Sequence, residues 1–191
     1  MGTAAFSWRM SRHYDLLLLH NSDDHHSCVR PAASWDEDSL RPKVFAERCK
    51  RRSFGLYHFY LIVADIQCKS MYYIKHTQIF SVEYHEVTPG AYILSECGLN
   101  GMGRNDPTNA KSETLMIQFE KMLASNQEYD YQIAKTIMTN PTRADEDDVL
   151  SSVFVDTVGY GTVRTSSIIV EDFIDKLNMF GLRFFERGGL F

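Results

Sequence analysis

The order of strand-like and helix-like patterns along this chain limits it to one fold class. Apolar runs rich in branched and aromatic residues come first, two segments with apolar residues at helical spacing follow, and strand-like runs end the chain. A parallel sheet would need strands and helices in alternation, because every parallel connection is a long crossover. Strands and helices are instead grouped here, so the sequence predicts an α+β fold.

The same patterns give the expected bounds of each element. Strands are expected at 3–9, 15–20, 57–66, 71–75, 79–84, 91–95, 151–157, 163–170 and 182–186. Helices are expected at 43–49, 110–126 and 128–138, and the first two strands are expected to form a hairpin. The run at 57–66 is almost continuously apolar, which predicts a strand covered on both faces. The stretch 98–109 is rich in Gly and Asn and is expected to be a loop.

Length, charge and cysteine spacing exclude several classes of protein. With 191 residues the chain is long enough for one domain, which we expect to span 1–191. A formal net charge of −5 argues against a nucleic-acid partner, and the short basic run at 48–52 is interpreted as a solvated connector. The four scattered cysteines predict reduced thiols and a cytoplasmic protein. No stretch approaches the ~20 apolar residues that a membrane span requires.

Two apolar runs lead directly into clusters of small and polar residues. Leu16 to Leu19 precede Asn21, Asp23 and Asp24, and a second run leads through Tyr160, Gly161 and Thr162 to Arg164. The first cluster either orients groups at the mouth of a pocket or ends a strand with Asx turns. In the second cluster the guanidinium either binds a carboxylate or phosphate or makes a surface ion pair at a hairpin turn.

A third cluster suggests metal ligands but lacks their spacing. His20, His25, His26 and Cys28 lie within nine positions, yet their order matches no zinc pattern. We interpret this segment as a solvated loop and predict no metal site, with metal or haem ligation as the alternative.

Several short blocks occur in an order that resembles the Transport and Golgi organization protein 2 family, also called the NRDE family. Its members open with Met-Cys and continue into Asn-Arg-Asp-Glu; here the chain has Met1-Gly2 and then Asn21-Ser22-Asp23-Asp24. Residues 57–65 resemble the family's central strand. Thr88-Pro89-Gly90 with Ser95, and the stretch 160–165, resemble its later blocks. Ser27-Cys28-Val29-Arg30-Pro31 is similar to its Ser-Arg-Pro, with two residues inserted.

The resemblance implies a fold and a set of site residues. Members resemble N-terminal-nucleophile hydrolases, so a four-layer αββα sandwich is expected, with a shortened N-terminal sheet because only residues 36–56 separate the first motif from the central strand. The implied ligand-binding residues are Asn21, Asp23, Asp24, Arg30, Ser95, Tyr160, Gly161, Thr162 and Arg164. No catalytic residue is assigned, because Gly2 stands where the family has Cys and has no side-chain nucleophile.

The resemblance also implies a function. We expect a non-catalytic cytoplasmic protein associated with the Golgi or mitochondria, acting in Golgi organisation and protein secretion and in haem trafficking. Its expected ligand is haem or an acyl compound, held between the sheets; the sequence names no partner protein. Two alternatives stay open: an amidohydrolase-like enzyme whose nucleophile is an exposed N-terminal Thr3, and a degraded paralogue without a ligand.

Overall fold

The computed structural model describes residues 2–11, 13–25, 41–51, 58–76, 82–100, 109–125, 131–171 and, for the backbone, 180–186. Within it the chain divides into two compact units. The first comprises Met1–Cys28 and Pro89–Phe191, and the second comprises Val29–Thr88. The chain therefore leaves the first unit after its opening hairpin and returns to it sixty residues later.

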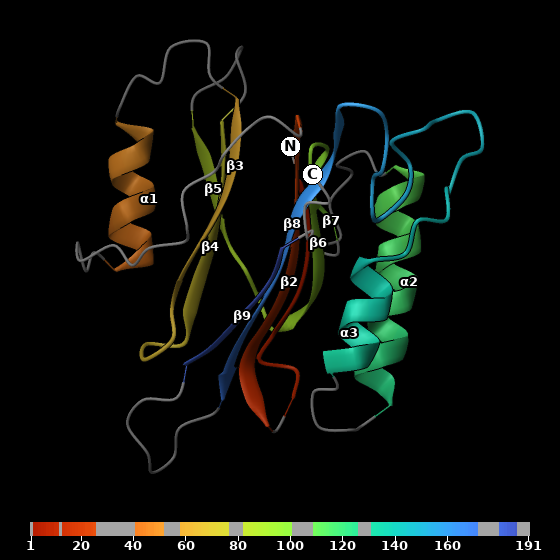
Figure 1. The fold of residues 1–191 in the computed structure, drawn as a ribbon. Coiled ribbons are helices and arrows are strands. Elements are labelled where there is room, and N and C mark those ends of the chain that lie inside the picture. Colours follow the sequence, from red (N-terminus) through yellow and green to blue (C-terminus); the bar gives the residue numbers. More distant parts are fainter. Residues whose placement is uncertain are drawn as a thin grey trace. The chain divides into compact units, whose positions relative to one another are not determined.

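The first unit is built on an antiparallel sheet with the strand order β7-β6-β1-β2-β8-β9 (Figure 1). The strands are β1 (Gly2–Trp8), β2 (Tyr14–His25), β6 (Gly90–Ser95), β7 (Gly98–Asn100), β8 (Tyr160–Glu171) and β9 (Phe180–Glu186). The predicted hairpin between the first two strands is confirmed, with Gly2 opposite Ser22 and Trp8 opposite Leu16. Strand β2 therefore lies in the interior of the sheet, paired on one side with β1 and on the other with β8.

Two helices cover one face of this sheet, α2 (Ala110–Ala124) and α3 (Tyr131–Met138). The side chain of Asn109 caps α2 by accepting a hydrogen bond from the backbone N–H of Ser112 at 2.8 Å. Leu115 and Phe119 lie one turn apart on α2 and are fully buried. The apolar core between the helices and the sheet consists of Ala5, Tyr14, Leu17, Leu19, Ile93, Leu115, Phe119, Ala134, Ile137, Met138 and Val153.

Four predicted elements of this unit are wrong in part. Strand β2 continues to His25, so its acidic residues belong to the strand instead of a turn, and β8 begins at Tyr160. The stretch at 98–109 includes the short strand β7. Residues 151–157 form only an isolated bridge, because Ser151 and Ser152 bond nearby carbonyls instead of a neighbouring strand. The two helices and the strand at 91–95 are confirmed to within a few residues.

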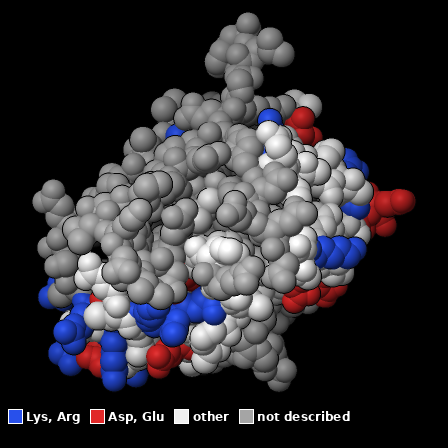
Figure 2. All heavy atoms as spheres, turned by 90° about the horizontal axis from the view of Figure 1, so that it is seen from below, with Lys and Arg blue, Asp and Glu red and all other residues white. Residues whose placement is uncertain are grey.

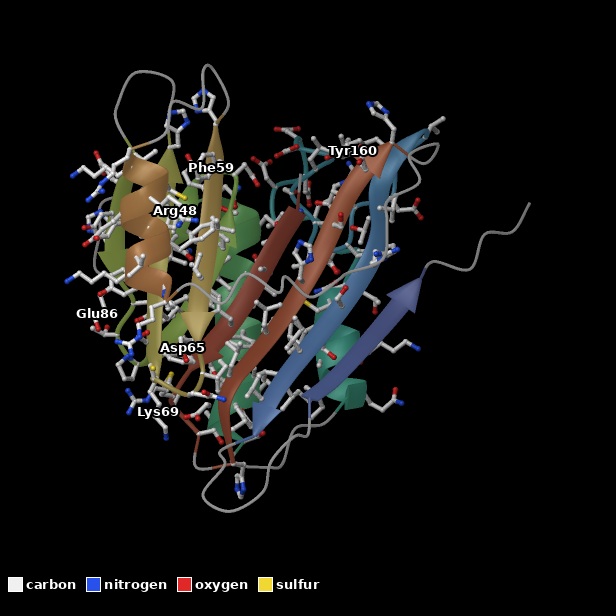
Figure 3. All side chains as sticks on the ribbon, turned by 90° about the vertical axis from the view of Figure 1, so that its left-hand side faces the viewer. Arg48, Phe59, Asp65, Lys69, Glu86 and Tyr160 are labelled. Atoms are coloured by element: carbon white, nitrogen blue, oxygen red, sulfur yellow. The ribbon has the colours of Figure 1, made fainter. Side chains whose placement is uncertain are left out.

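The second unit places helix α1 (Pro42–Lys50) on a three-stranded antiparallel sheet of order β3-β4-β5. Its strands are β3 (Phe59–Asp65), β4 (Ser70–His76) and β5 (Glu83–Glu86), and Figure 3 labels Phe59 and Asp65 at the two ends of β3. Ala46 and Cys49 of α1 are buried in a small core with Ile74 and Val82. The predicted helix at 43–49 is thus confirmed.

The strand predictions for this unit need two corrections. Every residue of β3 is half-buried or exposed, so the expectation of cover on both faces is wrong. Strand β3 lies at the edge of the sheet, and the fully buried Tyr73 and Ile74 belong to the central β4. The strand expected at 79–84 begins at Glu83 and ends at Glu86; residues 79–81 lie outside the described residues.

The predicted α+β class is confirmed, because both units combine an antiparallel sheet with helices. The single domain, the four-layer arrangement, the shortened N-terminal sheet and the likeness to N-terminal-nucleophile hydrolases stay predictions. None of the helices in the described part of the chain has the length and apolar character needed to cross a bilayer.

We expect Asp65 to stabilise the β3–β4 turn in a pH-dependent manner. Its Oδ1 accepts a hydrogen bond from the backbone N–H of Cys68 at 2.9 Å, and this bond is the main cause that lowers the pKa of the Asp65 carboxyl. Asp65→Ala should lower the free energy of unfolding by about 0.5–1 kcal/mol at neutral pH, the value of one exposed hydrogen bond.

The pH dependence follows from the direction of the shift. A depressed pKa in the folded state means that the stabilisation is complete above the ordinary carboxyl range near pH ~4. It fades as the pH falls through the folded-state value. Urea unfolding across acid pH should therefore show the difference between wild type and Asp65→Ala narrowing in acid, whereas Ala at the uncharged, exposed Gln67 of the same turn should give no such trend. A pH-independent difference for Asp65→Ala would contradict this account.

Candidate functional site

A layer of polar side chains lies inside the first unit, on the face of the sheet that the helices cover. It consists of Asn21 and Asp23 on β2, Lys111 on α2, and Thr162 and Thr165 on β8. All five are buried. Polar side chains of this kind enter a protein interior only when hydrogen bonds replace their contacts with water. We call these residues the polar layer.

A buried ion pair forms one half of the polar layer. The Nζ atom of Lys111 lies 3.1 Å from Oδ2 of Asp23, and each side chain is only 6% exposed. The hydroxyl of Thr162 donates to Oδ1 of the same carboxylate at 2.7 Å. That hydroxyl also accepts a hydrogen bond from the backbone N–H of Val155 at 3.0 Å. Both oxygens of Asp23 are therefore bonded, and the pair links α2, β2, β8 and the 151–157 segment.

The amide of Asn21 forms the other half. Its Nδ2 donates to the carbonyl oxygens of Met138 and Val153, each at 2.8 Å. Its Oδ1 accepts a hydrogen bond from the Thr165 hydroxyl at 2.7 Å. Both donors of the amide are used, and one side chain connects the end of α3, the 151–157 segment and β8.

Thr3, the alternative nucleophile, lies in the same interior. It pairs with Asn21, one position from the end of the β1–β2 ladder, and is 1% exposed. Its Oγ1 has no hydrogen-bond partner within the described part of the chain, so no base that the structure describes is in position to accept its proton. In this fold a substrate in solvent does not reach the Thr3 hydroxyl.

Position 2 has no room for a side chain. Gly2 lies opposite Ser22, and a Cβ atom built on Gly2 would come closer to the backbone oxygen of Asn21 than real Cβ atoms come to any neighbour. The same Cβ would lie 3.1 Å from Nε2 of His20. The close approach of β2 therefore requires glycine here. A cysteine at this position would force the two strands apart.

The other predicted ligand residues are dispersed. Ser95 ends β6, where its buried Oγ accepts a hydrogen bond from the backbone N–H of Cys97 at 3.2 Å. Asp24 accepts from the backbone N–H of His25 at 2.8 Å. Tyr160 pairs with His25 across β8 and β2, and the two rings meet edge to face at 5.5 Å. Gly161 forms the isolated bridge with Asp156. Arg30 lies outside the described residues.

Strand geometry separates Arg164 from the polar layer. Thr165 bonds Asn21 on the helix-covered face, and successive side chains of a strand point to opposite faces. Arg164 therefore belongs to the other face, where its register partner on β2 is Ser22. The structure thus brings Asn21, Asp23 and Thr162 together and places Arg164 apart from them. Ligand binding by the predicted set stays a prediction.

The two described histidines of the candidate metal cluster do not come together. His20 and His25 lie five residues apart on one extended strand, a span of roughly 16 Å at the rise of a β-strand. His26 and Cys28 lie outside the described residues. Within the described ranges, no three His, Cys, Asp or Glu side chains come together in the manner of metal ligands.

Two of the cysteines have weakened acidity. Burial is the main cause that raises the pKa of the Cys97 thiol, and Glu96 adds to it, whereas a hydrogen bond with Ser95 lowers it. A hydrogen bond with Asp65 is the main cause that raises the pKa of the Cys68 thiol. Since the thiolate is the nucleophile and the metal ligand, neither group is activated for such chemistry.

Sequence reasoning missed Lys111, the positively charged member of the polar layer. The signal was present, because Lys111 precedes Leu115 by one helical turn and therefore falls on the apolar stripe of the predicted helix. A lysine in such a stripe needs an acidic partner, and Asp23 was already singled out. Thr165 was quoted only as part of a motif, and its bond to Asn21 depends on the register of β2 against β8.

The fold and the polar layer define an α+β protein whose helix-covered antiparallel sheet is secured internally by a buried ion pair and an amide. Comparison with family models identifies the family: residues 37–187 match the model described as Transport and Golgi organisation 2. The chain belongs to this family, and the predicted resemblance is confirmed. A search of curated proteins gives no match.

We expect the two charges of the polar layer to depend on each other. Asp23→Asn alone leaves a buried lysine uncompensated, and Lys111→Met alone leaves a buried carboxylate. Each should lower the free energy of unfolding by about 3–5 kcal/mol. The double variant removes both charges and keeps an oxygen for the Thr162 hydroxyl, so its loss should be well below the sum of the two.

Urea unfolding of the four proteins measures this coupling as a double-mutant cycle. Lys121→Met, an exposed lysine on the same helix, is the matched control and should change stability by less than about 0.5 kcal/mol. Additive losses would show that the two side chains do not act as a pair.

Proposed function

We propose that this chain acts as a non-catalytic member of the Transport and Golgi organisation 2 family, working in the cytosol in Golgi organisation and protein secretion. It contributes by binding and not by chemistry. Its small-molecule ligand is haem or an acyl compound, carried without a covalent bond. Family membership supports the general role, and the interior of the first unit supports the non-catalytic part.

The observation that carries the proposal is the absence of space at position 2. N-terminal-nucleophile chemistry needs a side-chain oxygen or sulfur on the residue whose amine acts as base. Gly2 supplies neither atom, and the carbonyl of Asn21 fills the volume in which the side chain would begin. The strand pair is therefore built for glycine, so more than a single substitution separates it from an active arrangement.

The polar layer also supports a non-catalytic role. A catalytic carboxylate or amide must be accessible to the substrate, whereas both oxygens of Asp23 and both amide protons of Asn21 are bonded to groups within the fold. Both side chains are less than 5% exposed. Residues that occupy the position of the family's motif here stabilise the sheet and its helices.

A carrier protein binds its ligand through side chains that are accessible from solvent. Asp24 and Tyr160 at the ends of β2 and β8 are half-buried, as is Arg164, and of the predicted set they are the best placed to meet one. Tyr160 and Arg164 lie on opposite faces of β8, so each would contact a different part of a ligand at this strand end. The guanidinium suits a carboxylate or phosphate, which haem and acyl-coenzyme A compounds offer. We therefore assign the carrier role to this end of the sheet.

Restoring the family's residue at position 2 should damage the fold without producing an enzyme. Gly2→Cys should lower the free energy of unfolding by about 1–3 kcal/mol, because the strands must separate to admit the side chain. Gly2→Ala should cost a similar amount, since the Cβ atom causes the collision. Urea unfolding checks both values, and incubation with activated acyl esters followed by mass spectrometry checks for an acyl adduct.

The outcome separates the proposal from the hydrolase alternative. An undiminished stability of Gly2→Cys, or an acyl adduct at the start of the unmodified chain, would contradict the non-catalytic proposal.

Ligand binding should appear as a rise in melting temperature. A compound that binds only the folded state stabilises it by about 2.7 kcal/mol at a hundredfold excess over its Kd. Hemin and palmitoyl-coenzyme A are the probes, and at least one should raise the melting temperature. Arg164→Gln and Tyr160→Phe should reduce the rise, whereas the matched Arg143→Gln, on the 139–150 segment, should leave it unchanged. No rise with either probe would remove the carrier role and favour the paralogue without a ligand.

A further inference from the structure

The outward face of α1 gathers positive charge. At 3.6 residues per turn, positions 43, 44, 47, 48, 50 and 51 fall within one arc of about 160°. The opposite arc holds Pro42, Phe45, Ala46 and Cys49, which are buried or half-buried against the sheet of the second unit. The exposed cations on or beside the outward arc are Arg41, Lys43, Arg48, Lys50 and Arg51. We call this arc, with Arg41, the basic face.

The basic face contrasts with the rest of the chain. Residues 41–51 hold five Lys or Arg against the single acid Glu47, in a chain with 20 Lys+Arg and 25 Asp+Glu. The second unit, 29–88, holds nine basic and seven acidic residues, whereas the first unit holds eleven and eighteen. Figure 2 shows blue Lys and Arg side chains crowded together on the side where Figure 1 places α1.

Among the residues that the structure describes, neighbouring groups engage only part of this charge. Lys50 lies over the ring of Tyr84 at 5.9 Å from its centroid, and Arg41 is close enough to Asp65 to help lower the pKa of that carboxyl. Glu47 is half-buried between Lys43 and Arg51, each one helical turn away. Arg48, labelled in Figure 3, is exposed, as are Lys43 and Arg51. Among the described residues, the centre of the basic face therefore has three cations and one acid, and its net charge is positive.

An apolar side chain lies in the middle of these cations. Val44 is 46% exposed and falls between Arg51 and Arg48 on the outward arc. Single exposed apolar residues are common and by themselves indicate nothing. The apolar side of α1 packs on its own sheet, so Val44 can add only one small apolar contact to an electrostatic attachment of the cations to anionic lipid.

We propose that the basic face of α1 binds the surface of an anionic phospholipid bilayer. Lys43, Arg48 and Arg51 contact lipid phosphates and carboxylates, and Val44 enters the boundary between headgroups and acyl chains. Each cation near such a surface strengthens binding about fivefold. Because the attraction acts over a Debye length of ~8 Å at physiological salt, the binding is peripheral and reversible.

Charge and shape favour a bilayer over soluble polyanions. A nucleic acid or an acidic peptide is attracted by the cations alone and gives Val44 no role, whereas a bilayer uses both. A membrane-binding helix needs no strand or groove beside it, so α1 alone suffices.

Vesicle sedimentation tests this proposal with the full chain. The probes are phosphatidylcholine vesicles with and without phosphatidylserine. We expect the chain to sediment only with the phosphatidylserine vesicles and to be released by added salt. Lys43→Glu with Arg48→Glu should lower binding by well over tenfold, since each reversal removes one favourable charge and adds a repulsive one. Val44→Ser should lower binding severalfold.

The matched control makes the same charge change elsewhere. Lys121→Glu with Lys135→Glu, on the exposed sides of α2 and α3, should leave binding unchanged apart from a small non-specific loss. Circular dichroism and the melting temperature should be unchanged in every variant, because all substituted side chains are exposed.

Each of three results would overturn the proposal. In the first, the chain does not sediment with phosphatidylserine vesicles. In the second, it binds equally to both kinds of vesicle. In the third, the control variant loses as much vesicle binding as the variant with Lys43→Glu and Arg48→Glu. Inositol hexaphosphate provides a further comparison. If it competes fully and Val44→Ser has no effect, the face binds soluble polyanions and not a bilayer. The ligand titration with hemin and palmitoyl-coenzyme A is independent of these results, so membrane binding and the carrier role succeed or fail separately.

Discussion

The buried pair of Lys111 and Asp23 determines how the first unit is assembled. An uncompensated charge in this interior is strongly destabilising, so α2 can dock on the sheet only in the register that brings the ammonium to the carboxylate. Thr162 then fixes β8 against the same carboxylate, and its hydroxyl orients the 151–157 segment through Val155. Apolar contacts of Leu115 and Phe119 supply most of the attraction, but they are less selective about register.

The sequence predicts the elements of this protein better than it predicts their contacts. The apolar stripe at 110–126 predicts helix α2, and the run rich in aromatic and branched residues at 71–75 predicts β4, because both signals are local. The 151–157 segment was misread because Val153 and Val155 are buried at strand spacing while its serines bond their own backbone. Strand β3 was misread because apolar composition does not distinguish the edge of a sheet from its centre.

The same distinction between local patterns and long-range contacts applies to the candidate site. Asn21 and Asp23 were singled out from their position after an apolar run, and both lie in the polar layer. Their bonding to Met138, Val153 and Lys111 joins positions about a hundred residues apart in the sequence, which no local pattern reveals. The crowding at Gly2 likewise depends on the approach of the Asn21 backbone. The match to the family begins at residue 37, beyond both strands concerned.

Charged side chains therefore have different roles in the two units. In the first unit Asp23 and Asn21 of β2 turn inward and bond with Lys111 and with backbone groups, which leaves them little capacity for an external partner. In the second unit the cations of α1 turn outward, and one half-buried glutamate offsets them only in part. A buried charged group stabilises one arrangement of the chain, because leaving it unpaired away from water is strongly destabilising. A group of exposed charges of one sign can instead attract a partner of the opposite charge. Helix α1 is therefore the described element that presents exposed positive charge for recognition, although the most conspicuous sequence motif lies on β2.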